Sequence, residues 1–437
     1  MQKIDTIIEA GWILPIEPAD TILENSAIAI DKGRILEILP TDHAREKYQT
    51  DAWHHLPGHA LTPGLINAHT HASMSLLRGL ADDMPLMQWL QEHIWPAESQ
   101  HVNEEFIKDG TQLAIAEMLR SGTTCFNDMY FYPDITAKVA IDAGIRSTVG
   151  LIVLDFPSIW AADADEYINK GLEVIDHVRD EELISTAFAP HAPYTVSDKP
   201  LQHIQVLSNE LDIPIHMHIH ETQDEIQQSI ESCNMRPLER LKKLGLLSPN
   251  LIAVHMTHLE QHEIDDITEA GVHVIHCPES NLKLASGFCP VSKLSEAGVN
   301  IALGTDGAAS NNDLDMCGEM HMAALLAKAV ANDASTIPAM KALEMATLNG
   351  ARALGIDNNT GSLVAGKAAD IVAFDLDTIE TQPLYNPASQ LVYAGSRDKI
   401  TDVWVNGQHL LANKKLTRMD QQEILDKAKS WQQRINK

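Results

Sequence analysis

Two histidines, His69 and His71, end an apolar run that begins at residue 61, and one residue separates them. Alternate residues of a β-strand point to the same side, so both imidazoles can be presented to one point in space. Neutral imidazole is the commonest metal ligand among side chains. A His-x-His pair is a weak indication by itself. Whether it marks a metal site therefore depends on the rest of the chain.

Apolar runs of strand type recur along the chain and alternate with amphipathic stretches of helical type. The strand-like runs cover residues 61–71, 123–129, 147–154, 184–190, 213–220, 251–258, 272–277 and 300–305. The clearest helical stretches between them cover residues 106–120, 166–178, 201–211 and 260–270. Eight βα units of this length predict an α/β fold, a (β/α)₈ TIM-like barrel.

Catalytic groups in such a barrel lie at the C-terminal ends of the strands. The predicted strands end in a series of titratable residues: His69, His71, His191, His218, His220, Glu221, His255, His258 and Asp306. A single histidine near a strand end is usually an ordinary polar residue. This many titratable groups at the same end of several strands indicates a catalytic site.

Three imidazoles and the Asp306 carboxylate around one divalent ion would suit zinc, and also iron or manganese. Spacing leaves the third imidazole open, because His216, His218 and His220 share one face of the predicted strand. An extended strand would point Glu221 away from His218. We therefore expect the strand to end at His218 or His220 and the following loop to return Glu221 to the metal.

Both ends of the chain read as β-structure. Short strands are predicted at residues 6–8, 12–14, 27–30 and 35–38, with a hairpin turn at 31–34, and again at 370–374 and 401–407. Helices are predicted at 320–330, 337–354 and 420–433. We expect a small β-sandwich domain built from residues 1–60 and 362–412, a catalytic barrel at 61–361, and a C-terminal helical segment at 413–437.

Composition narrows the partners and the compartment. The formal net charge of −29 disfavours nucleic acid as a partner. Five cysteines without a Cys-x-x-Cys pair fit a reducing compartment. The first residues lack a signal-peptide pattern, and no apolar run is long enough to span a bilayer. We expect a cytoplasmic protein without a membrane partner, and a homo-oligomer, either a dimer or a tetramer.

Several stretches together resemble the amidohydrolase superfamily: PGLINAHTHASMSLLRG, HMHIHET, AVHMTH and LGTDGAASNN. More narrowly they are similar to its 5′-methylthioadenosine/S-adenosylhomocysteine deaminase branch, which is related to the triazine hydrolases. The resemblance extends over nearly the whole chain, through SNLKLASG, TLNGARALG and GSLVAGKAADIVAFD.

The resemblance implies the role of each site residue. One divalent ion per subunit would be bound by His69, His71, His218 and Asp306. Zinc is the expected ion, with iron or manganese as alternatives. The catalytic groups would be Glu221, which shuttles protons, His255, which polarises the attacking water, and Asp306. The substrate contacts would be Trp89, Glu98, which binds a ribose diol, His191, Glu221 and Asp306. Two-metal relatives carry a lysine at the end of strand four; residues 184–191 contain none, which supports a single ion.

The implied activity is hydrolytic deamination of 5′-methylthioadenosine, and of S-adenosylhomocysteine or adenosine, to the inosine-type product and ammonia. Relatives that bind the amino-acid tail of S-adenosylhomocysteine use an arginine after strand three. Here Arg146 precedes that strand and the next arginine is Arg179, which favours a methylthio group. Trp160 and Phe156 could contact that group or could belong to the core.

Two alternatives remain. One is another amino-heterocycle hydrolase of the superfamily: a triazine chlorohydrolase, a guanine deaminase or a cytosine deaminase. The other is an assembly protein that has lost catalysis, but the chain keeps every residue of the implied ligand set.

Overall fold

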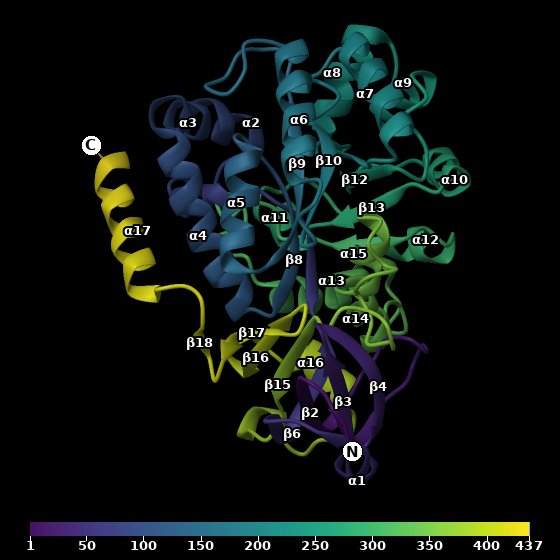
Figure 1. Ribbon diagram of the computed structural model, residues 1–437. Helices are drawn as coiled ribbons and strands as arrows, with labels where there is room; N and C mark the ends of the chain where they lie inside the picture. Colours follow the sequence, from purple (N-terminus) through teal and green to yellow (C-terminus); the bar gives the residue numbers. More distant parts are fainter. Residues whose placement is uncertain (437) are drawn as a thin grey trace.

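The computed structural model describes residues 1–436, and its largest element is a barrel of eight parallel strands (Figure 1). Its strands pair in the order of the chain: β7 (Leu65–Thr70), β8 (Thr123–Tyr130), β9 (Arg146–Val153), β10 (Ile184–Pro190), β11 (Ile215–Ile219), β12 (Leu251–His255), β13 (His273–His276) and β14 (Ile301–Leu303). The Asp306 N–H donates to the His69 carbonyl at 3.0 Å and so joins the last strand end to the first. The predicted barrel is confirmed.

Helices follow the strands and cover the outside of the barrel. They are α4 (Glu104–Arg120), α5 (Pro133–Ala143), α6 (Ala164–Val178), α7 (Asp198–Leu211), α8 (Gln223–Cys233), α9 (Pro237–Lys243), α10 (Gln261–Ala270), α11 (Pro278–Lys283), α12 (Val291–Glu296), α13 (Met316–Ala331), α14 (Ala339–Met345) and α15 (Leu348–Ala353). Side chains accept N–H bonds at several helix starts, for example Asn103 before α4 and Thr222 before α8. Gly144 and Gly271 end α5 and α10 in the left-handed conformation that glycine adopts most readily.

A second sheet draws its strands from both parts of the chain that flank the barrel. Its order is β18 (Lys415–Leu416), β17 (Gln408–Ala412), β16 (Ile400–Val405), β15 (Ile371–Asp375), β6 (Ala52–Pro63), β2 (Thr6–Ile13), β3 (Leu23–Asp31) and β4 (Arg34–Pro40). The predicted hairpin turn is present between β3 and β4, with Lys32 and Gly33 both at positive φ. In Figure 1 this sheet lies at the end of the barrel away from α2 and α3.

The remaining elements are short, apart from the last helix. They are β1 (Gln2–Lys3), β5 (Tyr48–Gln49), α1 (Thr41–Lys47), η1 (Ala72–Leu77), α2 (Leu86–Trp89), η2 (Leu90–Ile94), α3 (Trp95–His101), η3 (Ile379–Thr381), α16 (Pro387–Tyr393), η4 (Arg397–Lys399) and α17 (Gln421–Ile435). Trp431 anchors α17 on α4, because its indole N–H donates to Asp109 at 3.0 Å. Within residues 1–436, no helix combines the length and apolarity that a bilayer crossing requires.

Two predicted elements are divided in the structure. The run at 61–71 contributes its first residues to β6 of the small sheet, and barrel strand β7 begins only at Leu65. Gly64 lies between them, and a Cβ there would come 1.8 Å from the Thr124 hydroxyl oxygen. The helix predicted at 337–354 is two helices, since the chain turns at Ala346 and Thr347. The division of the chain at residue 60 stays a prediction.

Candidate active site

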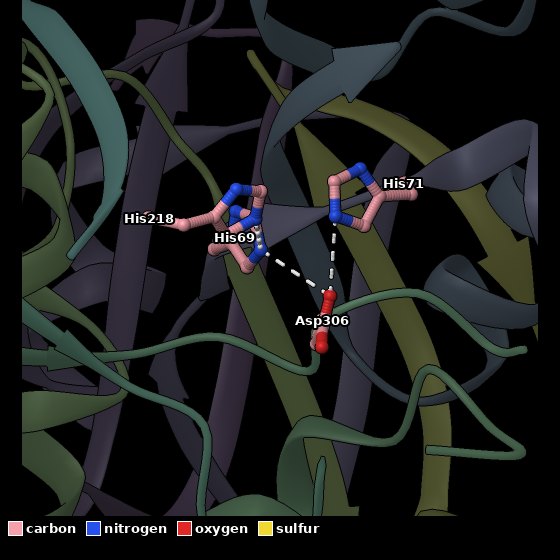
Figure 2. Close-up of side chains that lie close together, drawn as sticks. All are labelled: His69, His71, His218 and Asp306. Carbon is pink, nitrogen blue, oxygen red and sulfur yellow. Dashed lines mark hydrogen bonds and ion pairs between the residues drawn. The ribbon is translucent and has the colours of Figure 1, made fainter. Parts of the chain in front are cut away.

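Four side chains converge at the carboxyl end of the barrel (Figure 2). His69 and His71 come from the end of β7, His218 from β11, and Asp306 from the loop after β14. Asp306 Oδ1 lies 3.3 Å from Nε2 of both His69 and His71. His218 Nε2 lies 3.1 Å from His69 Nε2. The four potential ligand atoms all lie within 4.8 Å of one another, as around a single ion.

Hydrogen bonds on the far side of each imidazole ring fit a metal-binding role. His71 Nδ1 donates to the Met129 carbonyl at 2.5 Å, and His218 Nδ1 donates to the His191 carbonyl at 2.8 Å. A carbonyl can only accept, so both rings carry a proton on Nδ1 and can turn an Nε2 lone pair to the centre. His69 Nδ1 lies 2.9 Å from His216 Nε2.

The charges around the four residues favour a cation between them. Burial would lower the pKa of His71, but the Asp306 carboxylate raises it to about 9. Burial would raise the pKa of Asp306, but His69 and His71 hold it well below its usual range. Asp306 therefore keeps a negative charge although its side chain is buried, and a divalent ion would neutralise that charge.

The structure separates the three histidines that spacing left open. His216 lies two residues before His218 in β11, and its Nε2 contacts His69 Nδ1 rather than the centre of the site. His220 has a positive φ of 54°, which ends the strand alternation. Its ring turns outward, where Nε2 accepts from the Leu238 N–H at 3.3 Å. Of the three, only His218 joins the four-residue cluster.

Asp306 is held in place by residues that the sequence analysis left without a role. Its backbone has a positive φ of 61°. The Ser280 and Ser310 hydroxyls donate to Asp306 Oδ2 at 2.6 and 2.8 Å. Ser280 lies in the SNLKLASG stretch, but nothing in that stretch alone indicates a carboxylate partner. These bonds fix Oδ2 and leave Oδ1 facing the histidines.

Glu221 returns to the site as predicted, and the cause is visible. The left-handed turn at His220 redirects the chain, and the buried Glu225 carboxylate accepts the N–H groups of His220 and Glu221 at 3.1 and 2.8 Å. The Glu221 carboxyl then lies beside His255, with Oε2 3.8 Å from Nε2. Ser286 contacts its other oxygen at 3.4 Å. Burial raises the pKa of Glu221, which favours a proton on this carboxyl.

His255 is oriented by Asn281, a residue of α11. Its Nδ1 lies 2.9 Å from Asn281 Oδ1, which can only accept, so Nδ1 carries the proton. Nε2 faces Glu221 and the cavity. As at His220 and Asp306, the backbone φ of His255 is positive. Such strain at three strand ends is typical of functional sites.

A cavity of about 740 Å³ opens above these residues. Its floor includes His71, His191, His218, Glu221, His255 and Asp306. Its wall is largely apolar and includes Trp89, Ile94, Trp95, Met129, Phe131, Ile152, Leu154, Phe156 and Ile159. The predicted contacts Trp89, Glu98 and His191 all line it. Of the residues described, no lysine or arginine does.

The two arginines considered for a substrate tail are occupied elsewhere. Arg146 is buried at the start of β9, where it pairs with Asp370 at 3.1 Å, and Arg179 pairs with Asp176 on the surface. Trp160 is buried and packs against Tyr167 with ring centroids 5.6 Å apart, so it is a core residue. Phe156, by contrast, lines the cavity and is 45% exposed.

Comparison with known proteins places the chain in a family. Residues 60–410 match the family model described as "Amidohydrolase family". The chain belongs to the amidohydrolase family. It is 51% identical over 431 residues to a 5-methylthioadenosine/S-adenosylhomocysteine deaminase of Saccharophagus degradans, a match that covers 99% of this chain and 97% of the relative.

Solved structures agree with this assignment. A crystal structure of an adenosine deaminase from Xanthomonas campestris with bound zinc is 52% identical, with a TM-score of 0.99 over 100% of this chain and 99% of that one. An atrazine chlorohydrolase from Arthrobacter aurescens has a TM-score of 0.91 at 23% identity, over 98% of this chain and 99% of that one. The second likeness shows the amidohydrolase fold alone.

Proposed function

We propose that this amidohydrolase is a metal-dependent hydrolytic deaminase of purine nucleosides that acts on 5′-methylthioadenosine, and also on adenosine or S-adenosylhomocysteine. One observation carries the proposal: a four-residue ligand cluster lies beside Glu221 and His255 on the floor of a cavity large enough for a nucleoside. The printed names of the relatives that match over nearly the full length support the same activity.

One divalent ion, most readily zinc, would be held by His69, His71, His218 and Asp306. Three imidazoles and one carboxylate form a ligand set that zinc accepts, and the bound zinc of the Xanthomonas campestris structure supports this choice. When bound, the ion supplies Lewis acidity that activates a water molecule at neutral pH.

The protein side chains move the protons of the reaction. Glu221 donates a proton to adenine N1, which makes C6 electrophilic, and its raised pKa supports that role. Asp306 accepts a proton from the attacking water, and Ser280 and Ser310 hold its second oxygen meanwhile. His255, with a proton on Nε2 as well as on Nδ1, stabilises the negative charge that develops on the entering oxygen. Transfer of a proton to the exocyclic nitrogen then releases ammonia.

The cavity favours a nucleoside with an apolar 5′ substituent. Glu98 offers carboxylate oxygens to a ribose diol, and Trp89 offers an aromatic face. Near the exit of the cavity stand Phe156 and Ile159, and no described cation faces the tail carboxylate of S-adenosylhomocysteine. An anionic group there would lose its hydration without gaining a partner. We therefore expect 5′-methylthioadenosine to be preferred.

The decisive experiment compares kcat/KM for 5′-methylthioadenosine, S-adenosylhomocysteine, adenosine and free adenine by the ultraviolet change on deamination. We expect the first to react best and free adenine worst, since a site built for a diol discriminates against ligands that lack it. A higher kcat/KM for S-adenosylhomocysteine would contradict the argument about the tail.

The same assay tests the alternatives. Ammonia release from guanine or cytosine alone, or chloride release from a chlorotriazine, would replace the proposed substrate class. Absence of bound metal together with absence of turnover would favour a non-catalytic assembly protein. A cytoplasmic location and a homo-oligomeric state, either a dimer or a tetramer, remain predictions that fractionation and light scattering would test.

A further inference from the structure

The helical segment that carries Trp89 and Glu98 contains a π turn. It runs through α2, η2 and α3, and in η2 (Leu90–Ile94) the Trp95 N–H bonds to the Leu90 carbonyl five residues back. Pro96 follows directly. Proline has no N–H to donate, and its ring clashes with the carbonyl four residues earlier in a regular α-helix. The wider turn removes this conflict.

The π turn determines where Glu98 points. Glu98 follows Trp89 by nine positions, which would place the two about 180° apart on a regular α-helix of ~3.6 residues per turn. The additional residue of a π turn reduces that angle to roughly 80°. Accordingly both side chains line the cavity, although a regular helix would point one of them away from it.

Tyr130, at the end of β8, meets Glu98 inside the cavity. Its hydroxyl donates to Glu98 Oε1 at 2.6 Å. The Tyr130 side chain is 5% exposed, so the barrel strand fixes its position. This bond occupies one acceptor position of the carboxylate, and the others stay available for a ligand. A vicinal diol presents two O–H donors, which matches the two carboxylate oxygens.

We propose that Tyr130 is a positioning residue for the ribose diol: its hydroxyl holds the Glu98 carboxylate with both oxygens accessible to the ligand, and the π turn of η2 brings Glu98 within its reach. This inference deepens the proposed function and rests on it. Tyr130 acts on bound ribose and not on the reacting carbon. Its removal therefore changes KM for a nucleoside with a diol and leaves kcat unchanged.

The test compares Tyr130→Phe with Tyr132→Phe on adenosine and on 2′,3′-dideoxyadenosine. Tyr132 is the matched control, because its hydroxyl donates to the Ile159 carbonyl at 3.3 Å and not to Glu98. We expect Tyr130→Phe to raise KM for adenosine roughly tenfold, the usual effect of losing a hydrogen bond to a charged group. Its kinetics with dideoxyadenosine should match the wild type, and adding Glu98→Gln should abolish the difference between Tyr130 and Phe.

A second variant tests the π turn itself. Deletion of Glu92, an exposed residue of η2, removes the extra residue and should rotate Glu98 away from Tyr130. We expect bound metal to be kept, the melting temperature to fall because Pro96 then clashes with the preceding helical turn, and the preference for adenosine over dideoxyadenosine to be lost. Deletion without loss of that preference, or an equal rise in KM for both substrates in Tyr130→Phe, would overturn the inference. Wild-type protein that deaminates no nucleoside would instead refute the proposed function and remove this inference with it.

Discussion

Replacement of Glu221 by glutamine tests the role of this side chain in proton transfer, because it removes the acidic proton and keeps the shape of the side chain. Glutamine has the size of glutamate and can keep the contact with Ser286, which lies 3.4 Å from Oε1. The backbone is unaffected, because Thr257 donates to the Glu221 carbonyl at 2.7 Å and Glu225 binds its N–H. What is lost is the acidic proton. Positioned general acids contribute ~10²–10⁴-fold, which corresponds to about 3–5.5 kcal/mol of transition-state free energy.

We expect a loss in kcat near the middle of that range, roughly 10³-fold or about 4 kcal/mol. His255 is a neighbouring titratable group, and its Nε2 lies 3.8 Å from the carboxyl. It could replace Glu221 only in part. The assay is the ultraviolet change on deamination, with metal content and melting temperature measured on the same preparation. Both should equal those of the wild type, since Glu221 is outside the four-residue ligand cluster.

Asp224→Asn is the matched control, since it makes the same acid-to-amide change on an exposed side chain three residues away. It should leave kcat unchanged. A Glu221→Gln variant with full metal content and kcat within tenfold of the wild type would remove Glu221 from the mechanism. Loss of metal in that variant would instead show that the carboxyl supports the ion.

Three further predictions follow from the described contacts. His218→Ala should empty the metal site and abolish turnover together, as metal analysis and kinetics will show, because its Nε2 is one of four clustered ligand atoms. Burial raises the pKa of Glu98 to about 7 against the opposing effects of Tyr130 and His71, so KM for adenosine should rise as the pH falls through 7 and Glu98 loses its charge. Arg146→Ala should lower the free energy of unfolding in urea by about 3–5 kcal/mol, because Asp370 is left buried and unpaired; Arg179→Ala, on the surface, should cost less than about 1 kcal/mol.

Each of these predictions has an opposite outcome. Full metal content in His218→Ala, with metal lost from the His216→Ala variant instead, would show that His216 and not His218 is the third imidazole ligand. A KM for adenosine that stays constant between pH 6 and 8 would mean that the charge of Glu98 is not needed. Equal stability of the Arg146 and Arg179 variants would show that the buried pair adds nothing beyond a surface pair.

The sequence predicted the barrel well because its strands are short apolar runs bounded by helical stretches. The alternation of a strand also placed His69 and His71 together, since β7 extends to Thr70. The same rule failed to choose among His216, His218 and His220. A positive φ at His220 ends the alternation, and depth within the barrel separates His216 from His218. Neither property has a local sequence signal.

Other parts of the site depend on contacts between distant segments. Ser280 and Asn281 lie in α11 and reach Asp306 and His255, and Ser286, just after this helix, reaches Glu221. Only a folded barrel brings these residues together, so their roles could not be read from spacing.

Secondary-structure type was also predicted more reliably than geometry. The segment around Pro96 was predicted to contact substrate through Trp89 and Glu98, yet a regular helix would have placed these two on opposite faces. A break in one predicted helix, at Ala346 and Thr347, was likewise missed, because neither residue is a helix breaker by composition.

The pairing of β6 with β15 imposes an order on synthesis of the protein. Pro63 lies opposite Ile371 in this antiparallel pair, so the partner strand of β6 is synthesised roughly 300 residues after β6 itself. At ~5–20 residues per second, this delay is about 15–60 s. Until then, one edge of β6 is unpaired and open to other strands. The intervening barrel can form while the ribosome is still at work, whereas the small sheet closes only after translation has passed β15. Stalled or truncated chains should therefore expose this edge and aggregate through it, even where the active site is already assembled.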